Sequence, residues 1–184
     1  MPRPRPPVRE EDEPMAMTWT AGRVAAVTII VLTIGFWVWV FAGGPDQANP
    51  DRLADRAYVD RTEKACYSLK RDLAQLPNAA DIRSATHRAE VLDQATAKVS
   101  AMVRTIEADA PTKGDDGKRL DGWFQDWHAY LGDRTDYAKR LRADPKARFY
   151  VSQNKRLKAS VDDTIQTFAD VNAMADCETP GDVG

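Results

Sequence analysis

Apolar positions beyond residue 50 recur at alternating steps of three and four, which is the spacing of one face of an α-helix. Asn49 and Pro50 supply an N-cap and a preset first turn, and Pro77 stops the pattern. We therefore predict a first helix between these points. Its inward face carries Val59, Thr62, Cys66, Leu69, Leu73 and Leu76.

A second, longer helix is predicted to begin near Asn78, because Asp81 follows three residues later as in a capping box. Residues 110–119, with Pro111 and two glycines, are then expected to form an exposed connection. The apolar face of this helix comprises Ile82, Ala85, Ala89, Leu92, Thr96, Val99, Val103 and Ile106.

A third helix follows the connection and is predicted to end before Asp144 and Pro145. The adjacent apolar residues 149–151 favour a kink or a short extended piece. A fourth helix is predicted from about Gln153 to Asp176. The third helix has its apolar positions at Leu120, Trp123, Trp127, Tyr130 or Leu131, Tyr137 and Leu141, and the fourth at Leu157, Val161, Ile165, Phe168, Val171 and Met174.

One segment departs from this periodicity because it is apolar on every side. Residues 24–41 contain no charge, and a helix of this length at about 1.5 Å per residue matches a hydrocarbon core of about 30 Å. We predict a transmembrane helix over residues 19–42, in contact with the lipid bilayer. Its expected interfacial anchors are Trp19, Arg23, Trp37 and Trp39. A cleaved signal peptide is the alternative, since Val40 and Ala42 could precede a cleavage site, but the apolar run is longer than is usual there.

The predicted fold class is therefore all-α: one N-terminal transmembrane helix followed by an antiparallel four-helix bundle. The bundle is expected over residues 50–177, after a linker at 43–49 and before a flexible C-terminal tail at 178–184. Residues 1–18 hold five prolines, a basic half and an acidic run, so they are expected to be a disordered tail.

Charge near the span predicts its orientation. Arg23 adjoins the apolar run, whereas residues 42–51 contain no Lys or Arg. This asymmetry predicts a single-pass protein of the plasma membrane with a cytoplasmic N-terminus and an extracytoplasmic C-terminal domain. Cys66 and Cys177 both follow the span and are expected to form a disulfide, with two buried thiols as the alternative.

The overall charge of the chain argues against a nucleic-acid partner. Lys and Arg total 26 against 28 Asp and Glu, a formal net charge of -2, so the chain has no general basic field for nucleic acid. We expect no nucleic-acid partner.

The sequence contains no motif that predicts chemistry. His87 and His128 are its two histidines, and neither stands three residues after a glutamate, as a helical-bundle metal site would require. No phosphate-binding loop or nucleophile elbow occurs. We expect no catalytic, cofactor-binding or metal-binding residue, and hence a protein that is not an enzyme.

One aromatic stripe on the third helix is a candidate interaction surface. Aromatic residues and Arg are enriched at binding sites, but the same stripe is also typical of a bundle core whose polar ring atoms reach the surface. Its members are Trp123, Trp127, Tyr130, Arg134 and Tyr137.

The segments WHAYLGDRTDYAKRL, 127–141, and FADVNAMADCETPGDV, 168–183, with an upstream Cys and an N-terminal span, resemble a family of actinobacterial single-pass membrane proteins. The resemblance implies an extracytoplasmic helical domain. It implies no activity and no catalytic residue, because none is assigned to the family. Asn172 lies in the second segment, and we interpret it as a buried hydrogen-bonding residue near the bridge.

Together these features predict a membrane-anchored domain that acts by binding or structural interaction, with a protein partner in the cell envelope. Two alternatives stay open. The chain could be a subunit of an envelope membrane complex, for which Gly22 and Ala26 offer one small-residue spacing in the span. It could also be an enzyme acting on the envelope through an unrecognised pair of titratable groups.

Overall fold

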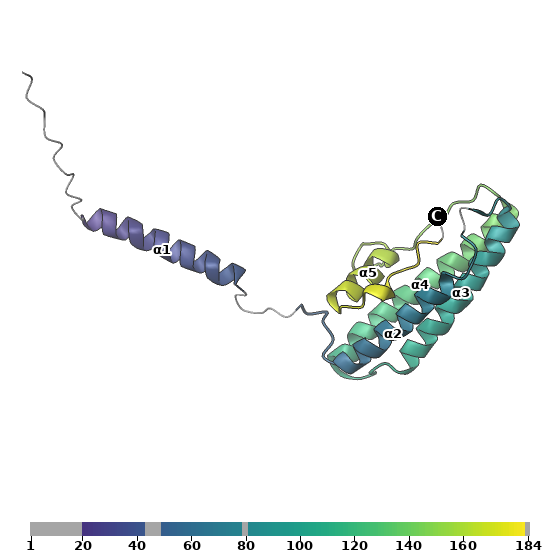
Figure 1. The fold of residues 1–184 in the computed structure, drawn as a ribbon, viewed down its shortest axis with the longest axis horizontal. Helices are drawn as coiled ribbons and strands as arrows, with labels where there is room; N and C mark the ends of the chain where they lie inside the picture. Colours follow the sequence, from purple (N-terminus) through teal and green to yellow (C-terminus); the bar gives the residue numbers. More distant parts are fainter. Residues whose placement is uncertain (1–19, 43–48, 79–80, 183–184) are drawn as a thin grey trace, which may run out of the picture. The chain divides into compact units, whose positions relative to one another are not determined.

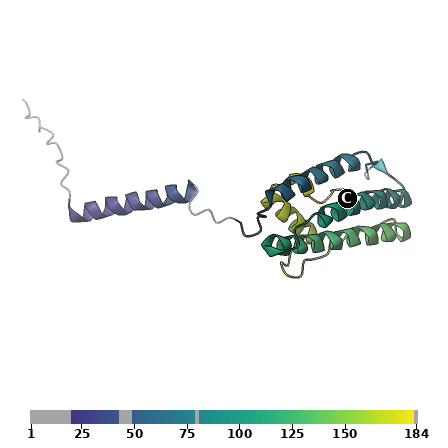
Figure 2. The same ribbon diagram turned by 90° about the horizontal axis from the view of Figure 1, so that it is seen from below.

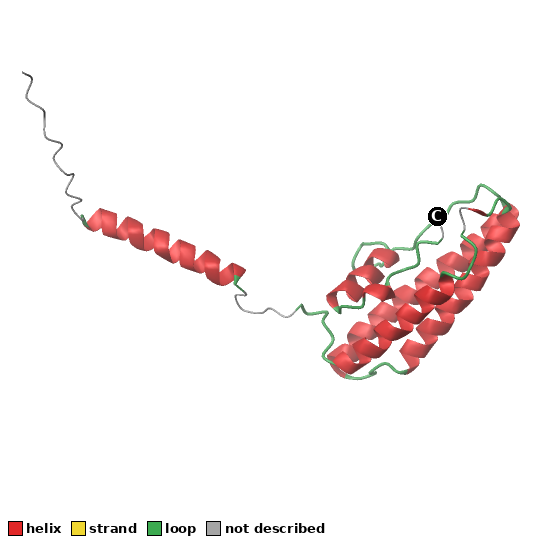
Figure 3. Ribbon diagram, viewed as in Figure 1, coloured by secondary structure: helices red, strands yellow, loops and turns green. Residues whose placement is uncertain are grey.

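The computed structural model describes residues 20–42, 49–78 and 81–182. The chain forms two compact units, residues 1–47 and 48–184, which are described separately. Within the described residues the regular elements are all helices and there is no strand (Figure 3). This agrees with the predicted all-α class.

Helix α1, Ala21–Phe41, is the regular element among the described residues 20–42 (Figure 1). It has no buried residue, and by length and composition it is apolar enough to cross a membrane. The hydroxyls of Thr28 and Thr33 donate to the carbonyls of Val24 and Ile29, at 2.9 and 2.8 Å, so neither polar side chain interrupts the helix. The expected tail at 1–18 and most of the linker at 43–49 lie outside the described residues.

Three long helices form the body of the second unit: α2 (Arg56–Leu73), α3 (Ala85–Ala108) and α4 (Gly114–Ala143). Figures 1 and 2 show them lying side by side along their lengths. The short helix α5 (Val161–Val171) packs against α4, and the 3-10 helix η2 (Ala175–Cys177) packs against α2. The buried core lies among these five elements.

The helix starts differ from the predicted ones because other residues cap them. The carboxylate of Asp55 accepts from the backbone N–H of Tyr58, so α2 begins at Arg56 and not at residue 50. Asn49 instead accepts from the N–H of Asp51 in a local turn. The hydroxyl of Ser84 caps α3 in the same way.

Helix α4 begins inside the segment that was expected to be an exposed connection. Gly117 explains how the first turn fits, because a Cβ there would lie 2.6 Å from the carbonyl carbon of Thr112. Asp115 and Asp116 lie in the same turn, where negative charge is favourable to the helix dipole. The connection therefore shortens to residues 109–113.

The fourth helix predicted over 153–176 is wrong in its extent, because α5 covers only residues 161–171. The side chain of Asn154 accepts from the N–H groups of Arg156 and Leu157, at 3.0 Å each, and this local turn competes with a helix. Lys158 has a φ of 59° and Leu157 is exposed. The domain thus has three long helices and one short one in place of four long ones.

Candidate functional site

The two cysteines meet beneath the surface of the domain. Cys66 on α2 and Cys177 in η2 are buried, with 2.05 Å between their Sγ atoms, which is disulfide-bonding distance. The pair connects α2 to the last turn of the described chain.

The aromatic stripe of α4 lies in the core. Trp123, Trp127, Tyr130, Arg134 and Tyr137 are all buried. The ring centroids of Trp123 and Trp127 lie 6.1 Å apart, nearly edge to face, as do those of Trp127 and Tyr130. The indole N–H of Trp123 donates to the carbonyl of Ile165 on α5, at 3.3 Å. These side chains hold the domain together and do not form an exposed interaction surface in this structure.

Arg134 joins the core to the C-terminal segment. Its guanidinium donates two hydrogen bonds to the carboxylate of Asp182, at 2.5 and 2.8 Å, and a third to the hydroxyl of Thr96, at 3.0 Å. Burial lowers the pKa of Arg134, but the hydrogen bonds and charge of Asp182 raise the pKa by more, so the side chain stays charged. The hydroxyl of Tyr130 also donates to the carbonyl of Pro180, at 3.1 Å. Residues 180–182, expected to belong to a flexible tail, are therefore bonded to α4.

Asn172 is fully buried at the end of α5. Its side-chain carbonyl accepts from the N–H of Leu53, at 2.8 Å, and its amide donates to the carbonyls of Asp51 and Phe168. The side chain thus binds the segment before α2 to the C-terminal half of the domain.

A groove of about 930 Å³ lies on the side of the domain that contains the Cys66–Cys177 pair. The second half of α2, the start of α3, the end of α4 and residues 175–182 form its walls. Most of its lining residues are apolar: Cys66, Leu69, Leu73, Ala74, Leu76, Pro77, Ile82, Val91, Leu92, Ala95, Tyr137, Leu141, Ala175 and Pro180.

The charged groups around this groove fall into two kinds. Lys70 pairs with Asp176 at 2.9 Å, and Asp182 pairs with Arg134. Arg88, at the start of α3, has a buried Nε to which the described residues offer no hydrogen-bond partner. Glu178 also lines the groove and has no ion pair among the described residues. The groove therefore combines an apolar lining with one cation and one carboxylate that lack counter-ions within the described chain.

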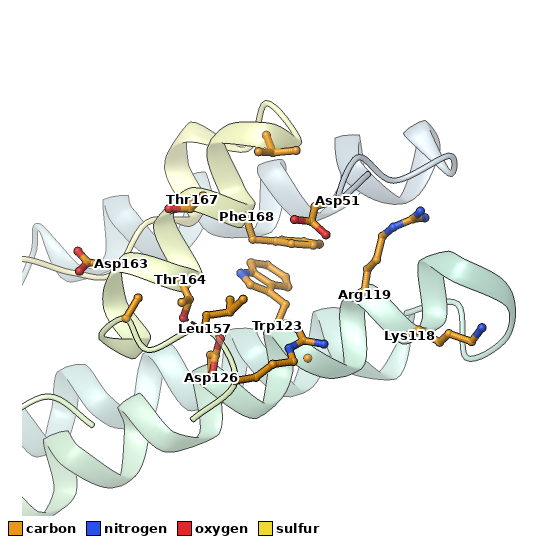
Figure 4. A pocket seen from close by; sticks show the side chains of 14 residues that line it. Asp51, Lys118, Arg119, Trp123, Asp126, Leu157, Asp163, Thr164, Thr167 and Phe168 are labelled. Carbon is orange, nitrogen blue, oxygen red and sulfur yellow. Dashed lines mark hydrogen bonds between the residues drawn. The ribbon is translucent and has the colours of Figure 1, made fainter. Parts of the chain in front are cut away.

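A smaller pocket of about 360 Å³ lies between α4, α5 and the segment before α5 (Figure 4). The rings of Trp123 and Phe168 stack in it with their centroids 5.2 Å apart. The carboxylate of Asp126 accepts from the hydroxyl of Thr164, at 2.7 Å, and from the amide of Asn154. These polar groups satisfy one another and form a bonded network on one side of the pocket. Charged side chains, among them Arg156 and Asp51, also line it.

The other described residues considered in the sequence analysis, the membrane anchors and the two histidines, do not line the groove. Trp37 and Trp39 are exposed on α1, Arg23 lies in its first turn, and Trp19 falls outside the described residues. His128 contacts the carboxylate of Glu107 on the surface, and His87 is exposed. Among the described residues no group of three His, Cys, Asp or Glu side chains could hold a metal ion.

Arg88 is the residue that the sequence analysis missed. It stands three, four and seven positions before Val91, Leu92 and Ala95, which places a cation on the apolar face of a helix. That spacing could have identified Arg88 as a candidate binding residue from the sequence. No protein-family model, curated protein or solved structure matches the chain, so its function has to be argued from this geometry.

Proposed function

We propose that this protein is a single-pass plasma-membrane protein whose helical domain lies outside the cytoplasm and acts by binding. In this proposal the segment 19–42 crosses the lipid bilayer and tethers the domain. The likeness of residues 127–141 and 168–183 to actinobacterial single-pass membrane proteins supports the same placement.

Two features support the orientation. Arg23 adjoins the apolar helix, whereas residues 42–51 carry no Lys or Arg, and positive charge favours the cytoplasmic side. The Sγ atoms of Cys66 and Cys177 lie at bonding distance, and disulfides persist outside the reducing cytoplasm.

The observation that carries the binding function is the large apolar groove. Ligand sites are typically concave, about 300 to 1,000 Å³ in volume, and mostly apolar with a few placed polar groups. The groove of about 930 Å³ with Arg88 on its wall meets each of these conditions. The groove, to which the aromatic stripe contributes Tyr137, is the surface at which we place the binding partner in the envelope.

Sidedness is tested with a membrane-impermeant maleimide on intact cells. Because Cys66 and Cys177 are buried, the experiment uses Ser68→Cys, an exposed position on α2, in a background with both native cysteines changed to Ala. The matched control is Thr18→Cys on the other side of α1. We expect label at position 68 in intact cells and label at position 18 only after lysis. The opposite pattern would overturn the orientation.

The disulfide is tested in the native chain by the same reagent. After denaturation under non-reducing conditions, we expect no labelled cysteine, and two labelled cysteines after reduction. Two labels without reduction would contradict the disulfide and remove its support for the extracytoplasmic placement.

A further inference from the structure

The helical walls of the groove favour a ligand without a polar backbone. In α2, α3 and α4 the N–H and C=O groups are bonded within each helix, whereas residues 74–78, Ile82 and residues 175–182 form the rest of the lining. An extended peptide along the helical walls would bury its own amides without partners, which is costly. A hydrocarbon chain has no such groups and would cover the half-buried side chains of Leu73, Leu76 and Ile82.

A negatively charged ligand is favoured because one cation of the groove lies outside its ion pairs. Lys70 is neutralised by Asp176, and Asp182 by Arg134. Arg88 is then the groove cation to which the described residues give no counter-ion. A buried donor of a charged group is costly to leave unbonded, and a carboxylate matches two N–H groups of a guanidinium at once.

One carboxylate of the groove limits the headgroup further. Glu178 lines the groove and has no ion pair among the described residues, so a headgroup with several negative charges would be repelled there. A single carboxylate at Arg88 adds one negative charge opposite one positive charge.

We propose that this groove binds a long-chain fatty acid, with its acyl chain along Leu69, Leu73 and Leu92 and its carboxylate on the guanidinium of Arg88. This assignment deepens the proposed function, because it rests on the same groove and names the class of ligand. The Cys66–Cys177 pair and the Arg134–Asp182 pair hold the C-terminal wall of the groove in place.

The experiment uses the full chain in nanodiscs of phosphatidylcholine and a photoactivatable hexadecanoate carrying a diazirine on its chain. After irradiation, mass spectrometry locates the crosslinks. We expect crosslinks in peptides from residues 69–82 and 88–95, and we expect unlabelled hexadecanoate to compete for them. Crosslinks in residues 21–41 report the probe that is dissolved in the bilayer and serve as the internal reference.

Three variants test the geometry. Arg88→Gln removes the cation, and we expect groove crosslinks to fall about 10- to 100-fold relative to those in α1, as for loss of a hydrogen-bonded charge. Arg71→Gln removes an exposed charge outside the groove and should leave the yield unchanged. Ala74→Trp fills the groove from an exposed lining position and should lower the yield while Arg88 remains. Circular dichroism checks that each variant is folded.

Two further probes identify the headgroup. The corresponding photoactivatable hexadecanol should crosslink the groove about 10- to 100-fold less than the acid, because it offers no charge to Arg88. Equal labelling by the two would overturn the role of Arg88. If phosphatidylglycerol in the discs displaces the acid from the groove, the occupant is a phospholipid and the fatty-acid assignment is wrong.

Failure of this assignment differs from failure of the proposed function. Crosslinks confined to α1 would overturn the ligand while leaving the membrane anchor intact. A protein that does not enter the discs, and shows no crosslink in α1, would overturn the anchor itself.

Discussion

Arg134 and Asp182 form a bidentate ion pair across 48 residues of sequence, between the middle of α4 and the C-terminal segment. The side chain of Arg134 has no exposed surface, whereas that of Asp182 is 33% exposed. The buried guanidinium of Arg134 is thus neutralised by a carboxylate that lies partly at the surface. It fixes the C-terminal wall of the groove to the helix that carries most of the aromatic core.

Replacing Asp182→Asn should destabilise the protein, because it leaves a buried guanidinium without a counter-charge. Breaking a buried ion pair costs about 3–5 kcal/mol, and the partial exposure of Asp182 places this one at about 2–3 kcal/mol. Chemical unfolding of the purified protein measures the difference. The matched control is Asp136→Asn, which removes an exposed pair with Lys139 and should change stability by about 0.5 kcal/mol or less. Equal effects of the two substitutions would contradict a special role for the Arg134 pair.

Removing the cysteine pair should destabilise the fold by enlarging the unfolded ensemble. For a sequence separation of 111 residues the chain-entropy model assigns about 4.7 kcal/mol, and removal of native disulfides typically costs about 2–5 kcal/mol. We expect Cys66→Ala, Cys177→Ala and the double variant to lose nearly the same free energy of unfolding, since either change removes the whole bridge. Additive losses in the double variant would show that the two side chains act independently.

Trp127→Ala tests whether the aromatic stripe is core. Trp127 has no exposed surface, so its truncation should cost about 3–5 kcal/mol through lost burial and the cavity left behind. Thermal unfolding followed by circular dichroism measures the change. Tyr67→Ala is the control, because Tyr67 is exposed on α2 and should change stability by about 0.5 kcal/mol or less. A fully stable Trp127→Ala protein would contradict the assignment of Trp127 to the core.

Tyr58 should make stability fall in alkali. Burial is the main reason that the pKa of Tyr58 is raised from 10.0 to about 12, and its hydroxyl donates to the carbonyl of Ile106. Between these two pH values the unfolded chain releases the phenol proton while the folded chain keeps it. Stability is therefore complete below pH 10 and declines towards pH 12, by up to about 3 kcal/mol for two pKa units.

The substitution Tyr58→Phe should flatten this alkaline decline, measured by unfolding at a series of pH values. The exposed Tyr67→Phe should leave it as in the parent chain. An alkaline profile that Tyr58→Phe does not alter would assign the decline to other groups.

The buried faces of the long helices could be predicted from the spacing of apolar residues along the sequence. The apolar positions of α2 and α3, such as Cys66, Leu69, Val99 and Val103, are buried as their spacing predicts. Helix ends were less predictable, because several neighbouring residues can cap. Asp55 and Ser84 took the roles assigned to Asn49 and Asn78, a choice that depends on where each helix meets the rest of the domain.

The groove could not be predicted from the sequence. The sequence places Arg88 on an apolar helix face, but only the packing of the neighbouring elements shows that its Nε has no partner among the described residues. The same holds for Trp123, Trp127 and Tyr130. Their spacing favours a core over an exposed stripe, but the contacts with α5 and the C-terminal segment decide it.

The sequence by itself determined the helical class, the apolar run at 24–41 and the inward faces of the long helices. Each of these depends on residues within a few turns of one another. Only the tertiary structure decided that α5 is short, that Asp182 neutralises Arg134 and that a groove opens beside Cys66 and Cys177. Periodicity reports which side of a helix is apolar, whereas contacts across 48 or 111 residues depend on how the elements pack.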